Sequence, residues 1–84
     1  MNASLDEIKK LMVSEIAKET DAPVESIDQE KSFQELGLDS ISSVYMINEL
    51  EDKFEIQLKA LHLLEYPTVN SFSKFVFTLA NENK

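Results

Sequence analysis

The chain has 84 residues, 43% of them hydrophobic, and sixteen acidic residues against eight lysines give it a net charge of −8. This length supports one hydrophobic core rather than two domains. The absence of cysteine excludes disulfides and thiolate metal sites, and the acidic charge without any arginine disfavours nucleic acid and anionic membranes as partners.

The first predicted helix begins after Ser4, because Ser4-Leu5-Asp6-Glu7 has the pattern of a capping box. Apolar residues then recur at helical spacing, at Leu5, Ile8, Met12 and Ile16. Asp21-Ala22-Pro23 breaks this pattern, so we expect the helix to end near Glu19-Thr20.

A long connection follows, from Asp21 to Leu38. Such a length normally counts against a compact helical domain, but apolar residues recur along this one. They are Val24, Ile27, Phe33, Leu36 and Leu38. We expect these side chains to hold the connection against the core, and residues 26–29 can add one helical turn.

The second predicted helix runs from Asp39 or Ser40 to Phe54, and a helical wheel divides it into two faces. The face expected in the core consists of Val44, Met46, Ile47, Leu50 and Phe54. The opposite face consists of Ile41, Tyr45, Asn48, Asp52 and Glu55, flanked by Glu49 and Glu51. This outer face is either a docking surface whose acids set the register of a partner, or a solvated face with two incidental apolar residues.

A short third helix is predicted over about Lys59 to Glu65, and Pro67 closes it. The last helix begins within residues 68–71, and its apolar face consists of Val69, Phe72, Phe75, Val76 and Leu79. Residues 81–84 are expected to fray. The pattern predicts an all-α fold: a small antiparallel four-helix bundle with a long first loop and a short third helix. We expect one domain over residues 1–84, with its core at about 4–80.

The most informative segment lies at the start of the second helix. Ser40 stands beside Asp39 and shortly after Gly37, the only glycine of the chain. A helix start presents unpaired N–H groups and the positive end of the helix dipole, which stabilise a phosphate. This placement favours Ser40 as the attachment point of a phosphorylated group rather than as a catalytic nucleophile.

These residues carry a family resemblance that covers nearly the whole chain. Gly37-Leu38-Asp39-Ser40-Ile41 resembles the G-x-D-S-[LMI] signature of acyl and peptidyl carrier proteins, and residues 33–36 and 66–69 also resemble that family. The resemblance implies that a phosphopantetheinyl transferase attaches 4′-phosphopantetheine from coenzyme A to Ser40. The terminal thiol of this arm would then carry acyl groups as thioesters between enzymes.

The resemblance also implies roles for the neighbouring residues. Leu38 would anchor the loop, and Asp39 would cap the helix, contact basic residues of partner enzymes, or do both. Ile41 would contact transferases and synthases. The implied partners are acyltransferases or ligases and ketosynthases with basic docking patches, met by a monomeric carrier. Tyr45 and Asn48 depart from the acid and the methionine that fatty-acid carriers often have there, so the predicted docking residues Tyr45, Asn48, Glu49, Asp52 and Glu55 form an altered surface.

Several branches of the family, which carry different groups, match this sequence. Residues 61–69 are closer to the pattern of polyketide and nonribosomal-peptide carriers than to that of fatty-acid carriers. The Asp-Ser pair and the acidity favour an acyl cargo, while aminoacyl, peptidyl and D-alanyl carriers remain alternatives. Met46 stands where carriers that receive β-branches typically have tryptophan, which argues against that role.

Another class of function must be weighed, an unmodified acidic helical interaction module in which Ser40 is only a helix cap. An enzyme is not expected, because His62 is the only histidine and no G-x-S-x-G motif is present. No acidic cluster has the spacing of a calcium-binding EF-hand, so no metal site is predicted. The start of the chain resembles no signal peptide, and we expect a free-standing cytoplasmic protein.

Overall fold

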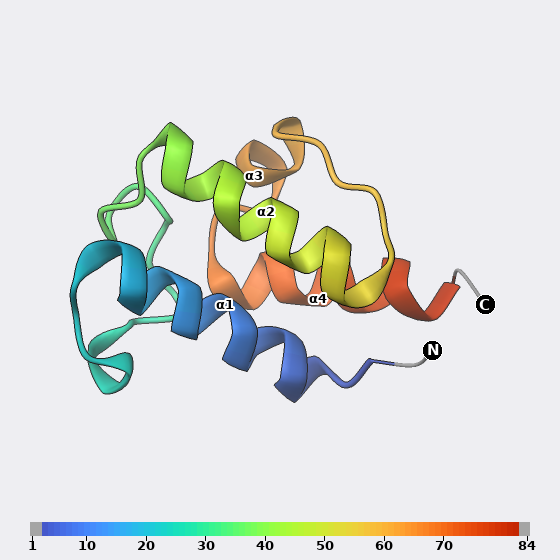
Figure 1. The fold of residues 1–84 in the computed structure, drawn as a ribbon, viewed down its shortest axis with the longest axis horizontal. Helices are drawn as coiled ribbons and strands as arrows, with labels where there is room; N and C mark the ends of the chain where they lie inside the picture. The colour runs from blue at the N-terminus through green and yellow to red at the C-terminus, as the bar shows by residue number, and fades with distance from the viewer. Residues whose placement is uncertain (1–2, 83–84) are drawn as a thin grey trace.

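The computed structural model describes residues 3–82, and these residues form four α-helices (Figure 1). The helices are α1 (Leu5–Thr20), α2 (Ser40–Phe54), α3 (Leu61–Glu65) and α4 (Val69–Glu82), with a 3₁₀ turn, η1, at Val24–Ser26. The predicted all-α fold with a long first loop and a short third helix is confirmed. Within residues 3–82, no helix has the length and apolar content needed to cross a membrane.

The arrangement of the helices is visible in Figure 1. α1 runs antiparallel to α2 and α4, which share one direction, and α3 lies across the far side of α2. The core is formed where α1, α2 and α4 meet. Its fully buried large side chains are Ile8, Met12, Ile16, Met46, Leu50, Val69, Phe72 and Val76.

Local signals explain where α1 begins and ends. The Ser4 side chain accepts the backbone N–H of Glu7 at 3.1 Å, and the Glu7 carboxylate accepts the backbone N–H of Ser4 at 3.3 Å. This is the predicted capping box. α1 ends at Thr20 because Asp21 takes a left-handed conformation with φ 56°.

The long connection is held by its own apolar residues and by backbone bonds to the start of α4. Phe33 and Leu38 are buried and Ile27 and Leu36 partly buried, as expected, but Val24 is 51% exposed and its predicted core position is wrong. The predicted turn at residues 26–29 is also displaced, since the 3₁₀ turn occupies residues 24–26.

The junction between α3 and α4 lies against this connection. The backbone N–H of Phe33 donates to the carbonyl of Pro67 at 2.9 Å, and Ser32 forms an isolated antiparallel bridge with Thr68. One residue into α4, the N–H of Asn70 donates to the Gln29 carbonyl at 3.2 Å. Residues 29–33 are therefore fixed by contacts that the local sequence does not specify.

The exposed side of α2 is wider than the helical wheel predicts. Met46, Ile47 and Leu50 are buried, but Val44 is 49% exposed, so its assignment to the core is wrong. Val44 lies about 120° from Leu50 around a helix with 3.6 residues per turn, which places it at the edge of the buried stripe.

α3 is shorter than predicted and is held by the partly buried Leu63 and by aromatic contacts. It begins at Leu61, and the Lys59 carbonyl accepts the N–H of His62 in the preceding turn. None of residues 61–65 is buried. The ring of Tyr66 stacks on Phe75 of α4 with centroids 4.6 Å apart, and the His62 ring lies 4.5 Å from the same Phe75.

α4 continues further than expected. Asn81 and Glu82 are helical, while residues 83–84 lie outside the described part. The Asn81 amide donates to the carbonyl of Ala3 at 3.2 Å and to that of Phe77 at 2.8 Å. The bond to Ala3 ties the end of α4 to the start of the described chain.

Candidate functional site

The start of α2 places Ser40 at the first helical position. The N-cap is Asp39, whose Oδ1 accepts the backbone N–H of Ser42 at 2.8 Å. Ser40 is exposed, and within residues 3–82 the side-chain hydrogen bonds of this turn are made by Asp39 and Ser42. The alternative in which Ser40 caps the helix is therefore wrong, because Asp39 has that role.

The N-cap residue Asp39 also places a negative charge next to Ser40. The hydrogen bond from the Ser42 backbone N–H lowers the pKa of Asp39, so this carboxylate is ionised at neutral pH. A negative charge here is also favoured by the positive end of the helix dipole. The capping role predicted for Asp39 is thus confirmed, and its exposed charge remains available to a basic partner.

The residues before Ser40 form a fixed turn rather than a loose loop. Gly37 has φ +96°, a conformation that L-residues with side chains rarely adopt. Leu38 is buried, and its N–H donates to the Phe33 carbonyl at 3.0 Å. The predicted anchoring role of Leu38 is consistent with this burial. Gly37 and Leu38 together hold Asp39 and Ser40 at the surface.

A second small capping arrangement stabilises the preceding turn. The Glu35 carboxylate accepts the backbone N–H of Ser32 at 2.9 Å, and the Ser32 hydroxyl accepts the N–H of Glu35 at 3.1 Å. The hydrogen bond from the Ser32 backbone lowers the pKa of Glu35. Residues 32–38 are therefore ordered partly by their own hydrogen bonds, in addition to the bond from Phe33 to Pro67.

A contact between α1 and α2 was not anticipated from the sequence. The Ser42 hydroxyl donates to Oε1 of Glu19 at 3.1 Å. Glu19 thus joins the first turn of α2 to the last turn of α1. The two residues are 23 positions apart, and neither the capping pattern nor the periodicity of either helix indicates such a pair.

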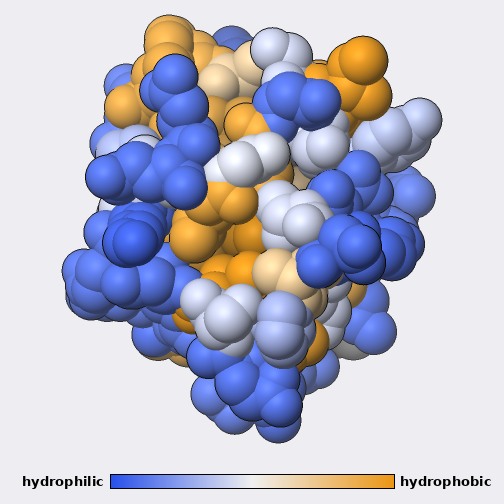
Figure 2. Space-filling view, turned by 90° about the vertical axis from the view of Figure 1, so that its left-hand side faces the viewer, coloured by the Kyte–Doolittle hydropathy of each residue, from blue (hydrophilic) through white to orange (hydrophobic). Residues whose placement is uncertain are grey.

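The surface beside Ser40 is more apolar than the sequence indicated. Ile41 and Tyr45 are 68% and 56% exposed, which agrees with their predicted outer face. Val44 of α2 and Leu61 and Leu64 of α3 are also exposed, which the sequence did not indicate. Figure 2 views the end of the molecule where α2 begins, and hydrophobic surface reaches the exterior there along its upper edge and down its centre.

The polar residues that were predicted to dock partners lie further along α2. Asn48, Glu49, Asp52 and Glu55 are all exposed, and Glu55 ends the helix in a left-handed conformation with φ 55°. Glu51, by contrast, is half-buried, and its carboxylate accepts the N–H of Leu58 at 2.9 Å. The outer face of α2 is therefore apolar near Ser40 and polar to acidic beyond it.

His62, the only histidine of the chain, lies in α3. Nδ1 of His62 accepts the backbone N–H of Lys59 at 3.0 Å, so it is engaged in the turn before α3. Within residues 3–82 no group of three or more histidine or acidic side chains is placed to hold a metal ion.

The chain resembles known proteins over most of its length. Residues 10–76 match the family described as "Phosphopantetheine attachment site". Polyketide synthase PksN of Bacillus subtilis is 30% identical over 70 residues, which cover 83% of this chain and 1% of that protein. An acyl carrier protein of Streptococcus pyogenes is 33% identical over 57 residues, covering 68% of this chain and 72% of the relative.

A solved structure supports the same relationship at the level of the fold. The free-standing peptidyl carrier protein from Acinetobacter baumannii superposes with a TM-score of 0.79 at 28% identity, covering 96% of this chain and 98% of that one. This chain spans only about 1% to 4% of the length of the synthases it matches. The exposed serine at a capped helix start lies inside the matched region, and the chain belongs to the phosphopantetheine-binding carrier protein family.

Proposed function

We propose that Ser40 receives 4′-phosphopantetheine from coenzyme A and that the chain carries acyl groups as thioesters between enzymes. The supporting observation is an exposed hydroxyl at the first position of α2 that helix capping does not use, because Asp39 is the cap. The Ser40 oxygen would form a phosphodiester, lose its proton and displace the nucleotide portion of coenzyme A. The thiol chemistry belongs to the arm, while this chain presents and orients it.

The fit of the arm to this position rests on three features of the chain. Ser40 is accessible, its backbone is fixed by the Asp39 cap, and Leu38 holds the preceding turn in the core. A phosphate at this place meets the positive end of α2. The Asp39 charge lies next to it, and the hydrogen bond from Ser42 offsets part of that charge.

The pathway we propose is polyketide or hybrid polyketide–peptide biosynthesis. The polyketide synthase relatives and the sequence of residues 61–69 support it. The likeness to a peptidyl carrier protein supports an aminoacyl or peptidyl cargo as the second candidate. The partners would be a phosphopantetheinyl transferase, an acyltransferase or ligase, and a ketosynthase.

We further propose that these partners dock on one continuous surface beside Ser40. Its apolar part consists of Ile41, Val44, Tyr45, Leu61 and Leu64, and its polar part of Asn48, Glu49, Asp52 and Glu55. Exposed apolar side chains around an attachment point are typical of a protein interface, and acids at the rim steer a basic partner. We call this set the α2–α3 surface.

Intact mass spectrometry tests the attachment. The protein is incubated with coenzyme A, magnesium and a broad-specificity phosphopantetheinyl transferase, and we expect the mass of one phosphopantetheinyl group to be gained. Ser40→Ala should gain nothing, whereas the matched control Ser43→Ala, three residues further along α2, should be modified like the wild type. Modification of Ser40→Ala, or of neither protein when both are folded, contradicts the proposal.

A further inference from the structure

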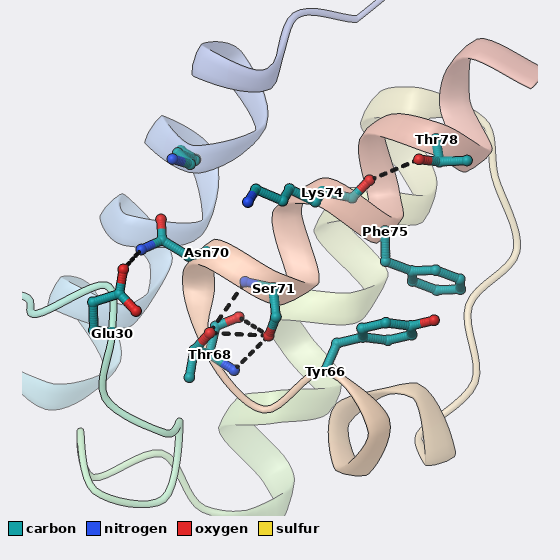
Figure 3. Close-up of a pocket in the computed structure, with 9 residues that line it drawn as sticks. Glu30, Tyr66, Thr68, Asn70, Ser71, Lys74, Phe75 and Thr78 are labelled. Carbon is teal, nitrogen blue, oxygen red and sulfur yellow. Dashed lines mark hydrogen bonds between the residues drawn. The ribbon is translucent and has the colours of Figure 1, made fainter.

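A second binding feature lies on another side of the molecule. A hollow of about 740 Å³ is formed by α1, the long connection, the α3–α4 junction and the outer side of α4 (Figure 3). No residue of the α2–α3 surface lines it. Any ligand of this hollow would therefore leave the surface around Ser40 accessible.

One end of the hollow is basic in a strongly acidic protein. Lys9 of α1 and Lys74 of α4 both line it, and Figure 3 shows Lys74 extending from α4 towards α1. Within residues 3–82 neither lysine forms an ion pair, whereas Lys10 and Lys18 are paired with carboxylates on α1. Two unneutralised positive charges thus face one space.

The wall also contains one carboxylate, so its ionisable side chains are two lysines and one acid, with a net positive charge. Glu30 accepts a hydrogen bond from the Asn70 side-chain amide, which fixes it against the start of α4. The backbone N–H of Glu30 is in turn bound by the Asp28 carboxylate at 2.9 Å. Figure 3 shows Glu30 and Asn70 turned towards each other at one margin of the hollow.

The other end is aromatic. Tyr66 and Phe75 stack with an interplanar angle of 13°, and both line the hollow. Thr78 lies further along α4, and its hydroxyl donates to the Lys74 carbonyl at 3.1 Å. The hollow therefore combines positive charge with an apolar wall, a combination that suits a ligand with carboxylates and one aromatic or apolar side chain.

We propose that this hollow, which we call the α1–α4 hollow, docks an acidic peptide segment of a partner protein through Lys9, Lys74 and the Tyr66–Phe75 stack. Charge complementarity favours an acidic segment here, because the net charge of −8 disfavours such a peptide on the rest of the surface. This inference does not depend on the attachment proposed for Ser40.

The test is a titration of the ¹⁵N-labelled protein followed by amide chemical shifts. The probe is a synthetic peptide with two glutamates on each side of a central phenylalanine, and the control peptide has glutamines instead. We expect the acidic peptide to shift amides around Lys9, Asn70 and Phe75, and the control to have little effect. No binding, or shifts centred on α2, would overturn the proposal.

A pair of variants with the same charge change identifies the site. Lys9→Gln with Lys74→Gln should weaken peptide binding at least about tenfold, whereas Lys10→Gln with Lys18→Gln should leave the dissociation constant within about twofold. Equal weakening in the two variants means a general charge effect and rejects the site. If inorganic phosphate produces the same shifts and competes with the peptide, the hollow binds simple anions and the peptide proposal is wrong.

Discussion

The Ser42 hydroxyl donates a hydrogen bond of 3.1 Å to the Glu19 carboxylate, joining the end of α1 to the start of α2. The same Ser42 donates its backbone N–H to Asp39. Ser42, two residues from the proposed attachment point, is thus hydrogen-bonded both to Asp39 at the start of α2 and to Glu19 at the end of α1. The long connection that separates Glu19 from Ser42 in the sequence does not separate them in the fold.

A double-mutant cycle on this pair should give a measurable coupling. We expect Glu19→Ala and Ser42→Ala to show an interaction energy of about 0.5–1 kcal/mol, because the pair is exposed and water competes for both groups. Urea unfolding of the two single variants and the double variant measures this value. Additive losses would mean that the contact contributes nothing to stability.

The division of roles between Asp39 and Ser40 predicts opposite outcomes for stability and modification. Asp39→Ala should cost about 1 kcal/mol of unfolding free energy because it removes the N-cap of α2. Ser40→Ala should change this free energy by less than about 0.5 kcal/mol, as is usual at exposed sites. Chemical denaturation distinguishes the two, and a loss of 1 kcal/mol or more in Ser40→Ala would contradict the assignment of the cap.

The stability of the fold should depend on the ionisation of Asp39 and Glu35. Backbone hydrogen bonds from Ser42 and Ser32 lower the pKa values of these two carboxyls below their usual 3.8 and 4.5. A carboxyl whose pKa is lower in the folded state stabilises the fold above its unfolded pKa. That stabilisation is lost as the pH falls through the folded value.

Comparison of the wild type with Asp39→Asn and Glu35→Gln isolates these two contributions from those of the other acids. The difference in unfolding free energy between wild type and each variant should be largest near neutral pH, and should shrink below about pH 4.5 for Glu35→Gln and below about pH 3.8 for Asp39→Asn. Urea unfolding over a range of pH measures it. A difference that stays constant to low pH would show that the charge of the carboxylate is irrelevant.

The apolar part of the α2–α3 surface should matter for partners and not for folding. Leu64 is 78% exposed, so Leu64→Ser should leave stability nearly unchanged. If Leu64 contacts partner enzymes, the variant should lower kcat/KM for modification or loading by about fivefold, equivalent to about 1 kcal/mol. Val24→Ser, at a residue 51% exposed and outside this surface, is the matched control. Equal rates for all three proteins would remove Leu64 from the docking surface.

α3 should open more readily than the rest of the fold. None of residues 61–65 is buried, and α3 is attached to the core through the partly buried Leu63 and through the rings of His62 and Tyr66 against Phe75. Amide hydrogen exchange should therefore be faster at residues 61–65 than at Met46, Ile47 and Leu50 of α2. Equal protection of the two helices would show that α3 is part of the cooperative core.

Most of the helical architecture could be predicted because its signals are local. The capping box at Ser4, Pro23 after α1 and Pro67 before α4 each act on the backbone within a few residues, and the observed helices begin or end near them. The position of Ser40 at the start of α2 followed from the same kind of signal. These features require no knowledge of how the helices pack.

The errors concern packing between distant segments. Val44 and Val24 are apolar and lie beside the predicted core stripes, but their burial depends on whether another element covers them. The Glu19–Ser42 contact and the aromatic stack on Phe75 join residues of different elements, and periodicity within one helix cannot indicate them. For this reason the predicted docking residues were mostly polar and did not include Val44, Leu61 or Leu64.

The backbone bond between Phe33 and Pro67 has a consequence for protein synthesis. A nascent chain that ends before Pro67 lacks the acceptor for Phe33 and the bridge partner of Ser32. The turn that presents Ser40 is therefore completed only after α3 and the start of α4 have left the ribosome. Modification of Ser40 during translation should begin late, and chains truncated before residue 67 should be poor substrates even though they contain the whole signature.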